Sequence, residues 1–243
     1  MDWTDEGIVL AARRHGESAL VLSLLTHGHG RHAGLVRGGG GRHSRGLFEP
    51  GNRVRATWKA RLSEHLGNYT CELVAADAAP LLDDPARLAA LASACALSEA
   101  ALPEREPHSG AFASLAGLIQ ALPGPGFAAA YVRWELALLT ELGFGLDLGR
   151  CAATGVAEGL SYVSPRSGRA VSAVAAEPYR DRLLKLPRFL VADAEPGPEE
   201  LVEGLRLTGH FLAAHAFAAR PAGVPAARAR LVERLARARR GLY

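Results

Sequence analysis

Arginine and lysine side chains gather between residues 31 and 61, and they are the side chains of this sequence best suited to bind an anion. The stretch holds eight basic residues and one acid, Glu49, although the chain as a whole has a net charge of only +3. Guanidinium groups pair well with phosphate oxygens, and clusters of them favour polyanions. The stretch therefore predicts a polyanion-binding surface, with nucleic acid as the first candidate. Its basic residues are Arg31, Arg37, Arg42, Arg45, Arg53, Arg55, Lys59 and Arg61.

The glycine run at 38–41 lies inside this basic stretch and could itself bind phosphate. It lacks the Gly-Lys-Ser/Thr ending of a nucleotide-binding loop and leads into Phe48-Glu49-Pro50, which cannot begin a helix. Two interpretations stay open: a loop through which DNA approaches the backbone, or an inert hairpin tip. Nearby histidines are spaced by glycines without an orienting carboxylate, so they favour polar turns over a metal site: His27, His29, His32 and His43.

Catalytic constellations are not evident in the sequence. The paired acids Asp83-Asp84 and Glu199-Glu200 fall at expected helix starts, where they suit capping, and no Gly-x-Ser-x-Gly motif occurs. The three cysteines are widely spaced without a CxxC pair, which indicates reduced thiols and neither a disulfide framework nor a zinc site: Cys71, Cys95 and Cys151. These features favour a protein that is not an enzyme.

Short alternating runs in the first 77 residues predict a small barrel that positions the basic residues. Turn-forming residues separate five candidate strands at 8–12, 19–26, 32–37, 53–60 and 69–75. A five-stranded barrel with a basic face is typical of the oligonucleotide-binding (OB) fold, although strand periodicity alone also allows an SH3-like barrel. Residues 53, 55, 59 and 61 share parity, so we expect them on one strand face, with Val54 and Trp58 pointing inward.

Aromatic side chains are few in this predicted barrel, where Phe48, Trp58 and Tyr69 are the ones expected. We therefore expect base stacking to be minor and backbone electrostatics to dominate, which gives binding without sequence specificity.

From residue 83 onward, the composition changes to alanine and leucine with helical periodicity. Helices are predicted near 86–102, 110–122, 127–142, 199–218 and 226–239, with a turn and hairpin insert at about 146–176. The sequence thus predicts an α+β multidomain protein, with an OB barrel at 1–80 and a helical domain at 81–243. The last helix carries Arg230, Arg234 and Arg237 on one face, which could extend a DNA path or remain solvated.

Several short segments, in this order along the chain, resemble the RecO family of recombination mediators. They are Gly16-Glu17-Ser18, Gly28-His29-Gly30-Arg31, Val36-Arg37-Gly38-Gly39, Cys151-Ala152-Ala153-Thr154-Gly155 and the hairpin from Tyr162 to Ser172. The resemblance implies binding of single- and double-stranded DNA, strand annealing, and help in loading RecA onto strands coated by single-stranded-DNA-binding protein. It also implies contact with the partner RecR, a surface that no residue identifies here.

Two further expectations depend on this resemblance. Many family members hold zinc with four cysteines in the insert, whereas here only Cys151 remains, so we expect the zinc site to be lost and replaced by the packing of Leu160, Tyr162, Val163 and Val171. The family also implies binding of the acidic tail of single-stranded-DNA-binding protein, for which Arg133 with Leu136 is the expected place. The alternative is that Arg133 only caps a core helix.

An apolar run long enough to span a bilayer is absent from the sequence, and the acidic first residues do not resemble a signal peptide. We therefore expect a cytoplasmic protein. The alternative to a DNA-repair mediator is an adaptor whose OB-like barrel binds RNA or an acidic protein.

Overall fold

The computed structural model describes residues 1–41, 44 and 46–239, with side chains described to residue 237. Contacts divide the chain into two compact units, Met1–Pro125 and Gly126–Tyr243, and each is described below by itself. None of the helices in the described part of the chain is long and apolar enough to cross a membrane.

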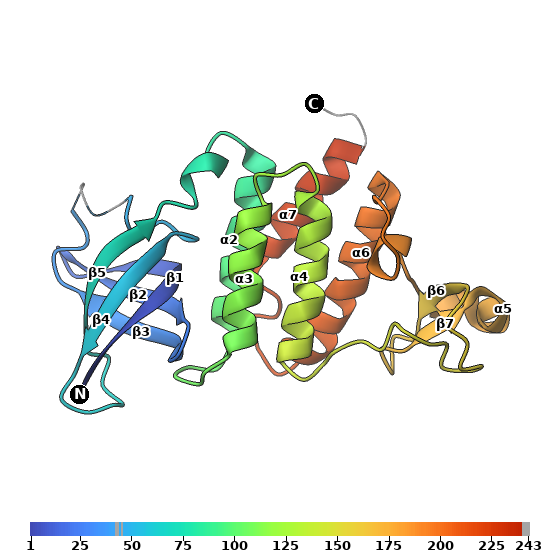
Figure 1. Cartoon of the computed structure of the whole chain (residues 1–243), viewed down its shortest axis with the longest axis horizontal. Helices are drawn as coiled ribbons and strands as arrows, with labels where there is room; N and C mark the ends of the chain where they lie inside the picture. Colours follow the sequence, from blue (N-terminus) through green and yellow to red (C-terminus); the bar gives the residue numbers. More distant parts are fainter. Residues whose placement is uncertain (42–43, 45, 240–243) are drawn as a thin grey trace. The chain divides into compact units, whose positions relative to one another are not determined.

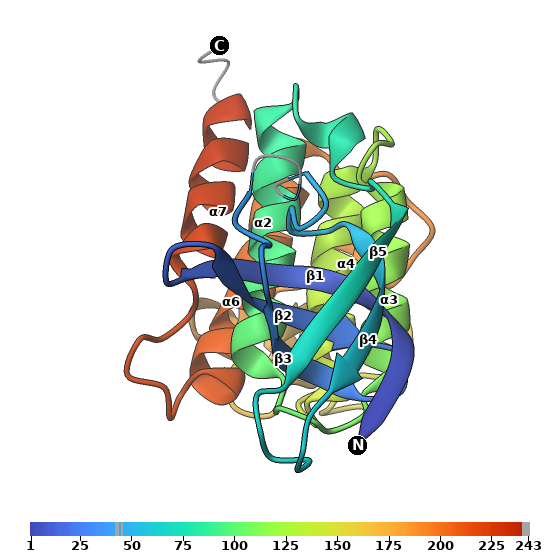
Figure 2. The same cartoon turned by 90° about the vertical axis from the view of Figure 1, so that its left-hand side faces the viewer.

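Five strands of the first unit close into a barrel in the order β1-β2-β3-β5-β4 (Figures 1 and 2). All neighbouring pairs are antiparallel except β3 with β5, which is parallel and has one register pair, Leu35 with Asn68. This arrangement is that of an OB fold, so the predicted fold class is confirmed. The strands are β1 (Asp2–His15), β2 (Ala19–Thr26), β3 (Gly30–Val36), β4 (Arg53–Lys59) and β5 (Asn68–Ala75).

Alternating burial along the strands fills the inside of the barrel. In β4, Val54, Ala56 and Trp58 are buried while the residues between them are partly or fully exposed. The inward side chains form one core cluster, which also contains Leu22 and Tyr69. Strand periodicity of two thus produces the barrel core directly.

The first strand is longer than the sequence predicted. It begins at Asp2, not at Ile8, because Asp2 to Gly7 pair in register with β4. The polar residues of this half obscured it in a search for apolar alternation. Trp3 is therefore a fourth aromatic residue of the barrel, which the sequence analysis missed.

In the middle of β1, the four residues Gly7 to Leu10 are all buried. One side faces the barrel core, and helix α2 (Pro85–Ala101) packs against β1 and β2 (Figure 1). The Asp84 side chain caps this helix by accepting hydrogen bonds from the backbone N–H groups of Ala86 and Arg87. The unit also contains a 3-10 turn, η1 (Ala79–Leu81), and helix α3 (Ser109–Ala121).

Three helices form the main body of the second unit: α4 (Phe127–Glu141), α6 (Pro198–Phe211) and α7 (Ala226–Arg239). The predicted helix at 199–218 changes after Phe211 into a π-helical turn, η4 (Leu212–Ala216). The other predicted helices agree with the structure to within one or two residues. Helix α6 contacts both α4 and α7, and Figure 1 shows α6 beside α4.

The insert of the second unit forms the predicted hairpin, β6 (Leu160–Val163) with β7 (Ala170–Ser172), and adds a third strand, β8 (Leu184–Lys185). Short helical turns accompany them: α5 (Ala173–Ala176), η2 (Glu177–Arg182) and η3 (Arg188–Leu190). Cys151, Val171 and Ala176 make a small buried cluster, against which Leu160 and Tyr162 pack. The two-residue strand β8 is too short to leave a sequence pattern.

Candidate nucleic-acid interface

The outer row of β4 carries three of the predicted DNA-binding residues. Arg53 is partly buried, while Arg55 and Lys59 are exposed, and Val54 and Trp58 point inward as expected. Arg61 lies beyond the end of the strand, in the segment between β4 and β5, so strand parity does not reach it.

Carboxylates from neighbouring strands lie beside this row. Arg55 stands opposite Glu6 of β1 and Glu72 of β5, and Lys59 stands opposite Asp2. Such cross-strand neighbours are close enough for opposite charges to interact. The sequence around β4 has an excess of positive charge, but strand pairing places carboxylates beside these basic residues, so the surface carries both charges.

Arg53 makes the strongest of these contacts. Its Nε donates to the Asp77 carboxylate over 2.7 Å, and its Nη1 lies 3.4 Å from Glu6. The hydrogen bond to Asp77 raises the pKa of Arg53. Arg53 is therefore held by the protein itself.

Arg31 is likewise occupied at the start of β3. Its Nε donates to the Leu102 carbonyl over 2.9 Å, and its own carbonyl accepts from the N–H of Arg105. Arg105 was not predicted as a functional residue, and its guanidinium donates to the carbonyls of Ser63 and His65. No motif marks Arg105, because its partners are backbone atoms of a distant segment.

Arg37 lies in a different environment, at the end of β3 beside the glycine segment 38–41. It is exposed, and its Nε donates to Asn68 Oδ1 over 3.1 Å. The N–H of Gly40 donates to the Ser18 carbonyl, which holds the glycine segment against the β1–β2 turn. Arg42 and Arg45, which follow this segment, lie outside the described residues.

Two hollows flank the glycine segment, and Gly39 lines both. One has a volume of about 440 Å³ and includes Arg37, and the other has about 210 Å³ and includes Arg14 of β1. Arg14, which was not among the predicted site residues, is exposed. Each hollow thus contains one arginine, and Glu49 lines the smaller hollow together with Arg14.

Aromatic side chains of the barrel are mostly enclosed. Phe48, Trp58 and Tyr69 are all buried. Trp3 is partly exposed and stacks on His29, with ring centroids 4.1 Å apart. Of the four aromatic residues named for the barrel, Trp3 is the one that reaches the solvent.

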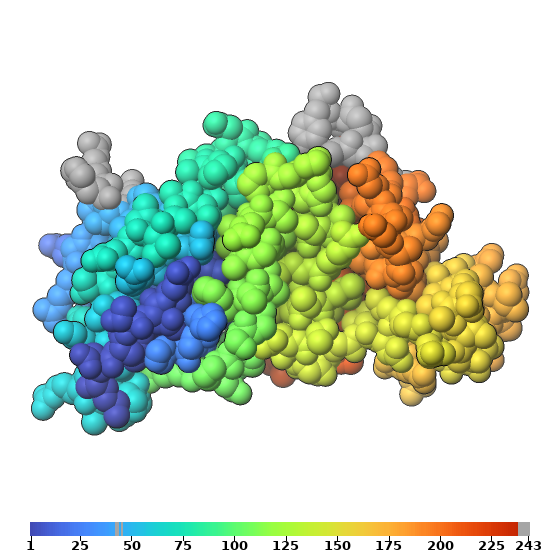
Figure 3. All heavy atoms as spheres, viewed as in Figure 1, coloured from blue at the N-terminus to red at the C-terminus, as the bar shows by residue number. Residues whose placement is uncertain are grey.

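At the start of the chain, the terminal amine of Met1 donates to the Ala60 carbonyl, and the N–H of Ala60 donates back to Met1. Figure 3 shows the dark blue first residues against the cyan segment that follows β4. Arg61 lies next to this contact in sequence and is exposed.

In the second unit, the predicted partner-binding residues lie on α4. Arg133 is exposed, its Nη2 donates to the Phe189 carbonyl over 2.9 Å, and its guanidinium lies 5.4 Å from the Phe189 ring centroid. Leu136 is partly buried. One side of the Arg133 guanidinium is therefore engaged in a contact with η3.

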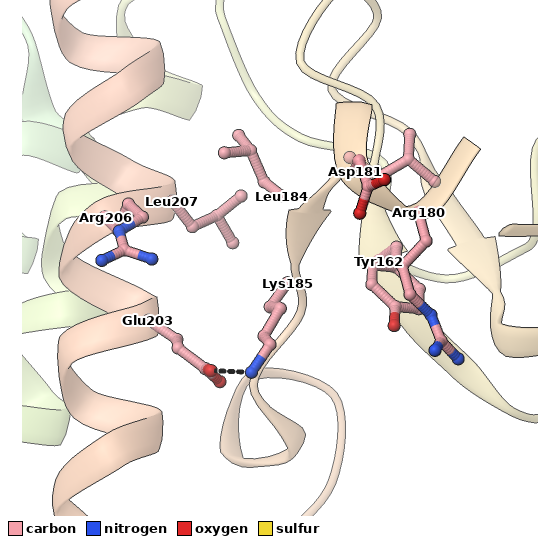
Figure 4. Close-up of a pocket in the computed structure, with 9 residues that line it drawn as sticks. Tyr162, Arg180, Asp181, Leu184, Lys185, Glu203, Arg206 and Leu207 are labelled. Carbon is pink, nitrogen blue, oxygen red and sulfur yellow. Dashed lines mark hydrogen bonds and ion pairs between the residues drawn. The ribbon is translucent and has the colours of Figure 1, made fainter. Parts of the chain in front are cut away.

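A hollow of about 330 Å³ lies between α6, β8 and η2 of the same unit (Figure 4). Its wall combines leucines with three cations, of which Lys185 pairs with Glu203 over 2.5 Å. Arg206 is exposed, and no ion pair of it occurs among the described residues. The lining residues are Tyr162, Arg180, Asp181, Leu183, Leu184, Lys185, Glu203, Arg206 and Leu207.

The first arginine of the C-terminal helix is buried and cannot face DNA. Arg228 of α7 is 8% exposed and makes two hydrogen bonds, of 2.6 and 2.9 Å, to the fully buried Glu135 carboxylate of α4. Thr208 of α6 joins the same network, which links the three helices. Arg230 and Arg237 are exposed and Arg234 is partly exposed.

The insert's donor set does not fit a structural zinc ion. Such a site needs four nitrogen or sulfur ligands, whereas Cys151 Sγ is surrounded by hydrogen-bonding groups of Ser172, whose N–H lies 3.3 Å away. Hydrogen bonds from Ser172 and Thr154 lower the pKa of the Cys151 thiol to about 6. Across the described residues, no group of three or more His, Cys, Asp or Glu is placed to hold a metal.

An OB barrel followed by helices and a small three-stranded insert defines a class of two-part proteins with an oligonucleotide-binding fold. The families described as Recombination protein O N terminal and Recombination protein O C terminal match residues 1–76 and 82–222. The chain belongs to the recombination protein O (RecO) family.

Full-length relatives support this assignment. The DNA repair protein RecO of Rhodospirillum centenum is 60% identical over 240 residues, which cover 98% of this chain and 96% of the relative. The DNA repair protein RecO of Rhodospirillum rubrum is 53% identical over 98% of this chain and 97% of its own. That of a Jannaschia species is 49% identical, again over 98% and 97%.

The predicted boundary at residue 80 falls between the two family matches, whereas the contacts divide the structure at residue 125. The boundary at residue 80 marks a change in the kind of secondary structure, whereas the boundary at residue 125 marks a change in which residues pack together. The boundary of the folding unit stays a prediction.

Proposed function

We propose that this protein is a non-enzymatic mediator of DNA repair and recombination. It binds single- and double-stranded DNA, anneals complementary strands, and helps load RecA onto strands coated by single-stranded-DNA-binding protein. The observation that carries the proposal is the similarity of nearly the whole chain to proteins named DNA repair protein RecO, together with the OB barrel. Such work takes place at the bacterial nucleoid, in the cytoplasm.

The distribution of charge favours contact with the phosphate backbone at the glycine end of the barrel. Arg37 and Arg14 lie there, and Arg42 and Arg45 follow in sequence. Each phosphate that they neutralise releases counterions, so binding weakens as salt rises. The β4 row, beside its carboxylates, contributes less to this binding.

Two protein partners complete the proposal. RecR is one, and the acidic tail of single-stranded-DNA-binding protein is the other. The tail binds on the second unit at Arg133 and Leu136, where one edge of the guanidinium is already engaged, or in the hollow of Figure 4 at Arg206. A peptide with the tail's acidic and hydrophobic end distinguishes them: Arg133→Ala weakens binding in the first case and Arg206→Ala in the second.

The main test is annealing of complementary strands coated with single-stranded-DNA-binding protein. We expect the intact chain to accelerate annealing, and Arg37→Ala with Arg14→Ala to slow it. The double variant Arg55→Ala with Lys59→Ala is the matched control, because it removes the same two positive charges from positions opposite the carboxylates of Glu6, Glu72 and Asp2. A chain that does not accelerate annealing, but binds RNA or an acidic protein, would support the adaptor alternative.

Fluorescence anisotropy with a labelled strand across a salt series gives the second measurement. A steep fall of affinity with salt, flatter in the Arg14 and Arg37 double variant, supports binding at the glycine end. An equal loss in the control with Arg55→Ala and Lys59→Ala would place the binding site on the β4 row instead.

A further inference from the structure

The larger hollow of the barrel is a gap between β3 and β5. These strands share a single register pair, Leu35 with Asn68, and β5 continues to Ala75 without a further partner on that side in the described chain. The gap has a volume of about 440 Å³, within the range of roughly 300–1000 Å³ of small-molecule sites. Its lining residues are Val36, Arg37, Gly38, Gly39, Ser44, Leu47, Phe48, Asn68, Tyr69, Thr70 and Cys71.

The chemistry of the hollow suits a flat heteroaromatic group attached to an anion. Leu47 and the small accessible parts of the otherwise buried Phe48 and Tyr69 supply apolar surface, while the Thr70 hydroxyl can both donate and accept. Among the described residues, the Thr70 hydroxyl has no hydrogen-bond partner. A nucleobase has the same combination of an apolar face and a polar edge.

Arg37 lines the hollow, and a hydrogen bond within the protein orients its guanidinium before any ligand binds. The bond from its Nε to Asn68 Oδ1 fixes the plane of the group, and its two Nη atoms have no partner in the described part of the chain. Two parallel N–H donors match a phosphate. Gly38 has a positive φ of 71°, and no atom of the described residues comes within 4 Å of the place where a side chain would begin there.

We propose that this hollow accepts one unstacked nucleobase of a single strand while Arg37 binds an adjoining phosphate. The inference rests on the proposed DNA binding and deepens it. A base that is paired within a duplex cannot enter, so the hollow gives the barrel a preference for single strands. Sequence specificity stays low, because one hollow with few polar groups can accept more than one base.

An abasic strand provides the direct probe. Anisotropy compares a labelled single strand with the same strand in which several consecutive nucleotides lack their bases. The phosphates are the same in both strands, so binding by the backbone alone gives equal affinity. We expect the intact chain to bind the abasic strand roughly 10-fold more weakly, within the range known for one stacked base.

Two variants locate the effect. Thr70→Trp fills the hollow and should weaken binding to the normal strand until it equals binding to the abasic one. Thr4→Trp is the matched control, since Thr4 is exposed on β1 and does not line the hollow. Arg37→Ala should weaken both strands and lower the salt slope by about 0.7 for the one lost phosphate contact.

The outcomes separate the inference from the proposed function. Steep salt dependence with equal affinity for both strands overturns the base site and leaves DNA binding intact. No binding at low salt overturns the proposed function itself. Unchanged DNA affinity in a folded Thr70→Trp variant also overturns the base site. If that variant keeps its DNA affinity but no longer binds a protein partner, the open edge of β5 is a peptide site instead. If Thr70→Trp does not fold, the comparison of the two strands on the intact chain still decides.

Discussion

His32 lies inside the barrel, where its side chain is 3% exposed and Nδ1 is 3.0 Å from the Tyr69 hydroxyl. Burial, followed by the charge of Arg105, lowers the pKa of His32 from its ordinary 6.5 to about 4. As the pH falls, His32 of the unfolded chain therefore takes up a proton at a higher pH than His32 of the folded chain. The stability that neutral His32 contributes above pH 6.5 is lost as the pH falls toward 4. We expect the free energy of unfolding to drop by up to about 3 kcal/mol across this interval, measured by urea denaturation.

A His32→Gln variant separates this titration from that of other groups. The amide does not titrate and can still hydrogen-bond the Tyr69 hydroxyl. Its free energy of unfolding should change less between pH 6.5 and 4 than that of the intact chain. Equal pH dependence in both proteins would show that His32 does not control acid stability.

Arg105 holds the segment between β4 and β5 in a fixed conformation. Its backbone has a φ of 61°, which is rare for a residue other than glycine, and its guanidinium donates to Ser63 and His65 over 2.6 and 2.9 Å. We expect Arg105→Ala to destabilise the protein by roughly 1–3 kcal/mol and to speed hydrogen exchange at 62–67. Arg61→Ala, in the same segment but exposed, is the control and should leave exchange unchanged. Equal exchange in all three proteins would contradict this role.

At the level of elements, the pair of Glu135 and Arg228 links α4 to α7 through the interior of the second unit. Removing one partner leaves a buried charge without compensation, so Arg228→Met should cost about 3–5 kcal/mol in urea unfolding. The double variant Glu135→Leu with Arg228→Met should cost less than the single one, because no charge stays buried. A larger loss in the double variant would mean that the pair itself supplies net stability.

The insert is a second element whose stability can be tested directly. We propose that it folds around Cys151, Val171 and Ala176 without metal. Dialysis against a strong zinc chelator should leave its thermal unfolding unchanged, and elemental analysis of the purified protein should find less than one zinc per chain. Loss of structure on chelation, restored by zinc, would contradict this.

Most of the longer elements followed from the sequence because each has its own period. Alternation gave the strands, the 3.6-residue period gave the helices, and Asp84-Pro85 marked the start of α2. The candidate site followed less well. Arg53 and Arg55 belong to a stretch with eight basic residues, but their neighbours Asp77, Glu6 and Glu72 come from other parts of the sequence. Register, which decides such neighbours, cannot be read from one strand alone.

At the scale of the whole molecule, the same limit applies to the boundary between parts. Composition changes near residue 80, yet α2 packs against β1 and β2 and belongs to the first compact unit. Ile8 and Leu25 are opposite each other in register, both are fully buried, and neither belongs to the core inside the barrel. They form an outer face of the sheet that other parts of the unit cover.

A fragment that ends at residue 80 should therefore fail to fold alone, whereas a fragment of residues 1–125 should fold. Exposing Ile8, Leu10 and Leu25 would cost roughly 5 kcal/mol or more, which is comparable with the whole stability of a small domain. Removing α2 also deletes the Leu102 carbonyl that Arg31 uses and the Glu99 carboxylate that pairs with Arg13. Circular dichroism and cooperative urea unfolding of both fragments measure this difference. A cooperatively folded 1–80 fragment, as stable as 1–125, would place the folding boundary at the change in composition and make α2 a separate part.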